Sequence, residues 1–241
     1  MKYCIVILIG LLMVSCGKEE QHDFTLNGHV KGLKKGTVYL QKQKDTIMVT
    51  LDSIAVNGDS NFVLHSELPE PEVLFLKLDK NDNEDGTIAF FADKGITEIS
   101  STLKKFNFDA VVKGSKQQTV LDEYLNMMSN YNDRNLDMIK ESLESQKKND
   151  TSKTNALKTE FDNLLKSKYR YTINFAVNHR DSEVSPYLAI SEIPNTSISY
   201  LQQIYDTLTP HIKSSKYGKQ LNDFIKERQE AQDELVKENQ D

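Results

Sequence analysis

The sequence predicts an α+β protein in which an antiparallel β-sandwich, or a partly open β-barrel, precedes an α-helical domain. Two patterns support this fold class. From residue 23 to 114 apolar residues alternate with polar ones between turn residues, which is typical of half-buried strands. From residue 115 to 241 apolar residues recur every three or four positions, which is typical of amphipathic helices. We therefore expect an all-β domain at 23–114 and a helical domain with a polar tail at 115–241.

The β domain should contain about eight short strands with the spacing of a sandwich. They are expected at 24–30, 37–41, 47–56, 62–64, 73–78, 87–91, 96–99 and 106–112. Asn57-Gly58-Asp59 favours positive φ and predicts a hairpin turn. Pro69-Glu70-Pro71 should mark a sheet edge or a crossover, because proline cannot donate to a ladder.

The helical domain should begin at a capping box, in which Ser115 is followed three residues later by Gln118. One apolar face then carries Val120, Leu121, Tyr124, Leu125, Met128 and Tyr131. A second segment carries Leu136, Ile139 and Leu143, and a polar loop follows at 147–154. The longest helix is expected at about 156–177, with these residues facing inward: Leu157, Phe161, Leu164, Leu165, Ile173 and Ala176.

Three shorter helices should complete the chain. Ser185-Pro186 predicts a cap followed by proline in the first turn, with a helix through Ile193. Ser197 should cap the next helix, through Leu208, and the last helix should start near Ser215. Its tail, 226–241, is almost wholly charged and polar, so we expect it to fray or project.

The first sixteen residues, MKYCIVILIGLLMVSC, read as an export signal. Lys2 is followed by an apolar run that is too short to span a bilayer, and then by Ser15-Cys16. This ending resembles a bacterial lipobox, in which Cys16 would be acylated and become the mature N-terminus. A leader cleaved elsewhere, or an uncleaved anchor, is the alternative.

The residues after Cys16 predict the compartment. Residues 17–22 would form a tether that holds a folded body at a membrane surface without spanning it. Within it, Lys18-Glu19-Glu20 resembles the signal that sends lipoproteins of Bacteroidota to the outer face of the outer membrane; a plain solvated tether is the alternative. We expect an outer-membrane protein that faces either the cell surface or the periplasm.

Cysteine content and charge exclude several functions. Cys4 and Cys16 are the two cysteines of the sequence, so an acylated mature chain would hold no free thiol. Disulfides, thiol redox chemistry, cysteine nucleophiles and cysteine-bound zinc would then be excluded. The net charge is −6, and no basic patch interrupts the interspersed lysines and glutamates, so nucleic acid is not an expected partner.

One cluster resembles a calcium loop, with template positions 1, 3, 5 and 6 held by Asn81, Asn83, Asp85 and Gly86. Ala92 stands at position 12, where the template needs a bidentate glutamate, so a solvated loop fits better. The five histidines show no metal-binding spacing and should lie at the surface or in the core: His22, His29, His65, His179 and His211. We predict no metal.

Other candidate ligand-binding residues can also be explained by ordinary surface or packing roles. Lys31, Lys34 and Lys35 could touch an anionic lipid or polysaccharide, or could form a solvated turn. Tyr169 and Tyr171 could stack on a sugar, but they lie about 200° apart on a helix and do not form one platform. One of them should pack between the domains and the other should stay at the surface. No nucleophile elbow or phosphate loop occurs, so we predict no catalytic residue and no cofactor.

Four motifs carry a family resemblance. They are FTLNGHVKGLKKGTVYL (Phe24–Leu40), VVKGS (Val111–Ser115), NHRDSEVSPYL (Asn178–Leu188) and SKYGKQLNDFI (Ser215–Ile225). In this order they resemble Bacteroidota lipoproteins with an N-terminal domain of unknown function of the DUF4369 type, which often precedes a thioredoxin-like domain. Because this sequence has no Cys-x-x-Cys, the resemblance implies the fold, the lipid anchor and the compartment, but not the redox activity.

Three functions remain open. The first is a non-catalytic envelope protein that binds another protein or a glycan. The second is an accessory that acts in trans with a thioredoxin-like thiol-redox protein. The third, ranked last, is a hydrolase with an unrecognised site, which a pocket holding two or more titratable groups with shifted pKa values would favour.

Overall fold

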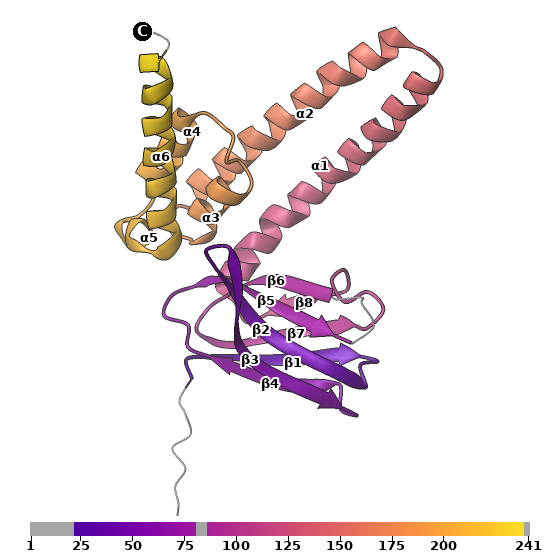
Figure 1. The fold of residues 1–241 in the computed structure, drawn as a ribbon, viewed down its shortest axis with the longest axis vertical. Coiled ribbons are helices and arrows are strands. Elements are labelled where there is room, and N and C mark those ends of the chain that lie inside the picture. Colours follow the sequence, from indigo (N-terminus) through magenta and orange to yellow (C-terminus); the bar gives the residue numbers. More distant parts are fainter. Residues whose placement is uncertain (1–21, 81–85, 239–241) are drawn as a thin grey trace, which may run out of the picture.

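The computed structural model describes residues 22–80 and 86–238, and it confirms the α+β fold class. Within these residues eight strands come first and six helices follow (Figure 1). The strands form two four-stranded sheets that do not close into a barrel. The helices lie beyond one side of the sheets, and the two longest project away from them as a hairpin (Figure 1).

The first sheet has the strand order β4-β1-β7-β8. Its strands are β1 (Phe24–Lys31), β4 (Asn61–Ser66), β7 (Gly95–Thr102) and β8 (Val111–Lys113). β1 and β7 run parallel, which differs from the antiparallel arrangement expected throughout the domain. Strands of the second sheet intervene between β1 and β7 along the chain, so a crossover rather than a hairpin joins the two, and a crossover permits parallel pairing.

The second sheet has the order β3-β2-β5-β6, and all its pairs are antiparallel. Its strands are β2 (Lys35–Lys44), β3 (Ile47–Asn57), β5 (Glu72–Asp79) and β6 (Gly86–Ala92). Alternate residues of both sheets face one shared core, where Leu26 of β1 and Leu76 of β5 are fully buried. Glycine suits position 28 of β1 because a Cβ atom there would lie 2.0 Å from the ring of Phe62, which packs over it.

Of two predicted turns, one lies as expected and the other does not form a hairpin. Pro69-Glu70-Pro71 lies in the crossover from β4 to β5, as one of the two predicted alternatives had it. Gly58 has the positive φ predicted for it, 93°, but the hairpin prediction was wrong, because β3 and β4 belong to different sheets. This turn therefore carries the chain from one sheet to the other.

The predicted strand 106–112 was also wrong over most of its length, because the paired residues are Val111–Lys113. Residues 104–108 form a turn in which the N–H of Phe108 donates to the carbonyl of Lys105 at 3.0 Å. Phe106 is nevertheless buried in the sandwich core, and its carbonyl accepts a hydrogen bond from the Ser101 hydroxyl at 2.6 Å. An apolar residue that plugs one end of a core need not belong to a strand.

The two long helices are α1 (Lys116–Lys147) and α2 (Thr151–Asn178). Ser115 caps α1 as predicted, since its hydroxyl accepts the N–H of Gln118 at 2.9 Å. The two segments expected before residue 147 are one continuous helix, and α1, at 32 residues, is longer than α2, at 28. The predicted loop shrinks to three residues, because Asp150 caps α2.

The inward face predicted for the helix at 156–177 is partly wrong, and several apolar residues of α1 are exposed. Leu157, Ile173 and Ala176 are buried in α2, and Phe161 and Leu164 are half-buried. The exposed residues are Leu165 on α2 and Leu125, Leu136, Ile139 and Leu143 on α1. The two helices contact each other along one line of side chains, so apolar residues off that line remain exposed.

The shorter helices are α3 (Val184–Ser191), α4 (Ile198–Thr207), α5 (Pro210–Ser214) and α6 (Lys216–Glu238). Ser185 does not cap α3, contrary to the prediction, because its hydroxyl donates to the carbonyl of Ala176 at 2.8 Å. Ser197 precedes α4 as predicted but makes no side-chain cap bond. Residues 229–238 stay helical and are exposed, so this part of the tail projects rather than frays.

The helices dock on the second sheet through one aromatic cluster. Phe91 of β6 packs with Tyr124 of α1, Phe175 of α2 and Tyr217 of α6. Gln118 adds a polar tie, because its side-chain oxygen accepts the N–H of Phe91 at 2.6 Å. The β part and the helices therefore share a buried interface.

Within residues 22–80 and 86–238, no helix has the length and apolar character needed to cross a membrane.

Candidate functional site

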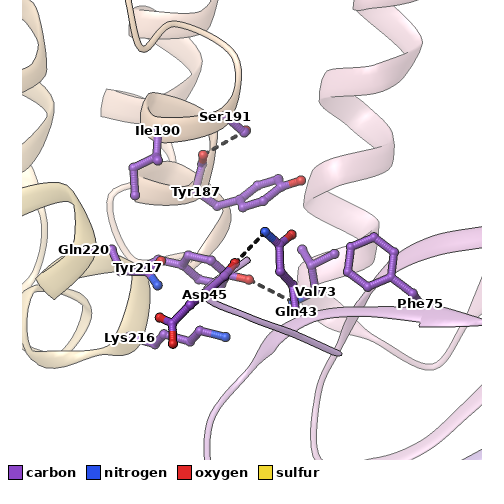
Figure 2. A pocket seen from close by; sticks show the side chains of 10 residues that line it. All are labelled: Gln43, Asp45, Val73, Phe75, Tyr187, Ile190, Ser191, Lys216, Tyr217 and Gln220. Atoms are coloured by element: carbon purple, nitrogen blue, oxygen red, sulfur yellow. Dashed lines mark hydrogen bonds between the residues drawn. The ribbon is translucent and has the colours of Figure 1, made fainter. Parts of the chain in front are cut away.

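A pocket of about 390 Å³ lies where the second sheet meets α3 and α6 (Figure 2). The strand side contributes Gln43, Asp45, Val73 and Phe75. The helix side contributes Tyr187, Ile190, Ser191, Lys216, Tyr217 and Gln220. This volume lies in the range of small-ligand sites. We call it the junction pocket.

The strand side of the junction pocket follows from the alternation of β5. Leu74 and Leu76 point into the sandwich core, so Val73 and Phe75 must point outward toward the helices. The turn after β2 adds the rim. There Asp45 has a φ of 54°, and the side-chain nitrogen of Gln43 donates to the Asp45 carbonyl at 2.9 Å. This bond holds the end of the hairpin beside the pocket (Figure 2).

The helix side is built around two tyrosines that meet edge to face. The ring centroids of Tyr187 and Tyr217 lie 5.3 Å apart, and both rings also pack against Phe91. The Tyr217 hydroxyl accepts the backbone N–H of Val73 at 2.9 Å. Burial raises the pKa of both phenols, so both stay protonated at neutral pH and can donate hydrogen bonds.

Charge in the junction pocket is largely neutralised. Lys216 pairs with Glu72, a buried residue that also pairs with Lys42 at 3.4 Å. Lys216 also lies 5.4 Å from the ring centroid of Tyr217. The remaining charged lining residue is Asp45, which is exposed. The pocket therefore suits a ligand of low net charge that has both an apolar face and hydrogen-bonding groups.

General acid–base chemistry has little support in the junction pocket. A catalytic acid or base works best with a pKa near the working pH. The shifted pKa values of Tyr187 and Tyr217 move away from neutrality. A hydrolase was expected to show two or more groups with shifted pKa values in one pocket. Tyr187 and Tyr217 meet that number, but both pKa values rise away from neutral pH.

A second pocket, of about 530 Å³, contains a carboxylate whose pKa moves toward neutrality. Glu183 is buried, and the Ser215 hydroxyl donates to its Oε2 atom at 2.6 Å. Burial is the main cause that raises the pKa of Glu183, and the negative charges of Glu70 and Asp93 raise it further. Glu70, Asp93 and His211 line the same pocket. Glu70 accepts the backbone N–H of Lys216, and Asp93 accepts the Ser115 hydroxyl and the N–H of Gln117, so both carboxylates are engaged at the starts of helices.

Several predicted residues lie outside the described part of the chain. These are Cys16, the Lys18-Glu19-Glu20 segment and the calcium-loop residues Asn81, Asn83 and Asp85. Among the residues that the structure does describe, no group of three or more histidines, cysteines, aspartates or glutamates could hold a metal ion.

Other predicted residues are brought together in ways that spacing did not show. The rings of His22 and His65 stack with centroids 5.1 Å apart, although 43 positions separate them. Tyr171 packs against Tyr124 in the docking cluster, while Tyr169 lines a separate surface pocket beside Tyr200. Both tyrosines are half-buried, and Tyr169 also packs against the core of the helices, so the prediction that one packs between the domains while the other stays at the surface remains a prediction.

The sequence patterns did not predict the junction pocket. Val73 and Tyr217 are 144 positions apart, and no local pattern joins them. One signal was available, because two of the four motifs each carry one of the pocket's tyrosines: NHRDSEVSPYL contains Tyr187 and SKYGKQLNDFI contains Tyr217.

Comparison with known proteins adds a family match but no function. Residues 24–121 match DUF4369, a domain of unknown function; the match covers the strands and the first residues of α1. The helical residues of the junction pocket lie beyond it. No curated protein matches the sequence.

Proposed function

We propose that this protein is a lipid-anchored, non-catalytic protein of the cell envelope that binds a glycan in the junction pocket. The observation that carries the proposal is the composition of that pocket. Three aromatic side chains, Phe75, Tyr187 and Tyr217, line it together with the amides Gln43 and Gln220. Sugars present apolar C–H faces that pack on aromatic rings and hydroxyls that bind amides and phenols.

The choice of a glycan over a protein partner rests on size and charge. A pocket of about 390 Å³ encloses a small saccharide unit rather than a flat protein surface. The pairing of Lys216 with Glu72 leaves little net charge to select a strongly ionic ligand. An aromatic side chain of a protein partner would fill the same pocket but would offer fewer hydroxyls to its amides and phenols.

The envelope location rests on the leader. The apolar run that ends at Ser15-Cys16 supports acylation of Cys16, and the tether from Gly17 would hold the β part close to the membrane. In this proposal the protein is a Bacteroidota outer-membrane lipoprotein that exposes the junction pocket to surface or periplasmic glycans. No Cys-x-x-Cys occurs in the sequence, so the proposal assigns it no thiol-redox activity.

Hydrolysis is the second candidate function, and Glu183 is the observation that favours it. A buried carboxyl group with a raised pKa in a concave pocket can act as a general acid. We rank this candidate lower because the two carboxylates that share the pocket, Glu70 and Asp93, already accept hydrogen bonds at the starts of α6 and α1. Loss of any detected hydrolysis in Glu183→Gln would support it.

A glycan array tests the leading proposal. The full chain should bind a restricted set of glycans, and Phe75→Ala and Gln43→Ala should each weaken that binding by about tenfold, the loss of one stacking or hydrogen-bonding contact. Tyr200→Ala is the matched control, because Tyr200 is an exposed aromatic residue of the separate surface pocket. Binding that Tyr200→Ala weakens and Phe75→Ala leaves intact would place the ligand elsewhere.

A further inference from the structure

The outer part of the α1–α2 hairpin is an arm that stands clear of the rest of the molecule (Figure 1). We define the arm as residues 129–167. Two ion pairs in it join α1 to α2, Arg134 with Glu160 at 2.8 Å and Glu141 with Lys153 at 3.5 Å, and Arg134 also pairs with Glu141 within α1 at 3.6 Å. The arm is therefore held together by its own two helices.

The arm carries an exposed apolar stripe on α1. Leu136, Ile139 and Leu143 are 63%, 42% and 55% exposed, and Leu125, nearer the sheets, is 46% exposed. At about 100° per residue these four side chains fall within roughly 60° of one another around the helix. Their spacing fits the alternating steps of three and four residues of a coiled-coil seam, with Ser129 and Asn132 at the intervening positions.

This stripe is separate from the contact between α1 and α2. The line of α1 that meets α2 contains Tyr124, Tyr131, Met138 and Ser145, which are seven residues apart and are buried or half-buried. α1 therefore has two seams, one covered by α2 and one open. An open seam with coiled-coil spacing fits a helix as its partner.

Charged residues beside the stripe indicate which helix is the partner. Asp133 and Lys140 flank it on the edge away from α2, and both are exposed. No ion pair is found for either of them in the described part of the chain. When a second copy of α1 lies antiparallel on the first, with Leu136 opposite its Ile139, each Asp133 faces Lys140 of the other copy.

We propose that the arm is a dimerisation surface, and that two copies of this chain pair antiparallel through the exposed stripe of α1. Leu136 and Ile139 form the centre of the contact, and Leu143 packs beside Asn132 of the other copy. The contact spans about 27 Å, the length of an 18-residue helical stretch. Such a short seam gives a modest affinity that the loss of one central leucine should abolish.

Co-purification tests the proposal. Two differently tagged copies of the full chain are expressed together and extracted in mild detergent, and the recovery of one with the other is measured. Leu136→Glu should lower this recovery at least about tenfold. The matched control is Leu235→Glu on α6, since Leu235 is 60% exposed and remote from the arm, and it should leave recovery unchanged.

A charge exchange tests the orientation. Asp133→Lys paired with itself, and Lys140→Asp paired with itself, should each associate poorly, because like charges then face each other. Asp133→Lys expressed with Lys140→Asp should restore recovery, because a lysine of the first variant then faces an aspartate of the second at both contacts. No self-association of the wild-type chain, or equal recovery with Leu136→Glu, would overturn the dimer; failure of the mixed pair to recover would overturn the antiparallel arrangement.

Discussion

The hydroxyl of Tyr217 accepts a hydrogen bond from the backbone N–H of Val73 at 2.9 Å. This bond joins the last helix to a strand 144 positions earlier, and both residues line the junction pocket. The contact that docks the helices on the sheet therefore also sets the shape of the pocket. Changes at the docking interface should alter stability and ligand binding together.

Tyr217→Phe should destabilise the protein by about 1–2 kcal/mol, because the Val73 N–H loses its partner while the aromatic packing is kept. Urea unfolding measures this change. Tyr200→Phe, at an exposed ring, is the control and should alter stability by less than about 0.5 kcal/mol. An equally small effect of Tyr217→Phe would show that the bond contributes nothing to docking.

Gly218→Ala should destabilise the protein by about 2 kcal/mol or more, although alanine favours a helix over glycine by about 1 kcal/mol. The steric term wins because a Cβ atom at Gly218 would lie 1.9 Å from the backbone oxygen of Ile212, which cannot rotate away. Thermal unfolding measures the change. Gly58→Ala, where φ is 93° and no atom lies near, should lose only about 1 kcal/mol from backbone strain.

Glu183→Gln should make stability less dependent on pH. Folding raises the pKa of Glu183 above its usual 4.5, so the folded state binds the proton more tightly than the unfolded state. The free energy of unfolding therefore keeps its full value below pH 4.5 and falls as pH rises through the folded pKa. The glutamine variant should therefore be more stable than the wild type at pH 8, and the two should converge near pH 4. Glu70, Asp93 and His211 face the same carboxyl group and stay unchanged in both proteins.

Urea unfolding of both proteins at several pH values provides the measurement. A stability difference that stays constant from pH 4 to pH 8 would mean that Glu183 does not titrate with folding.

Local patterns predicted much of the fold. Alternation located the strand at 73–78, and the pair Ser115 and Gln118 located the start of α1. These features depend on neighbours in the sequence. The parallel pairing of β1 and β7 depends on the route that the chain takes between two sheets, which alternation does not encode.

The candidate site was harder to predict for the same reason. Helical periodicity identifies apolar faces but not what covers them, so it did not distinguish the exposed Leu136 and Ile139 from the buried Leu121. The junction pocket forms only after α3 and α6 dock on β5. Phe75 alone is an outward residue of a strand, and Tyr217 alone is an aromatic residue of a helix.

Hydrogen exchange with and without a glycan selected on the array is the sharpest test of ligand binding in the junction pocket. We expect slower exchange in three segments that meet at the junction pocket: 43–45 at the end of β2, 187–191 in α3 and 216–220 in α6. Slower exchange in all three at once would show that the ligand bridges the β part and the helices. Protection confined to the arm, to the surroundings of Tyr200 or to the pocket of Glu183 would contradict it.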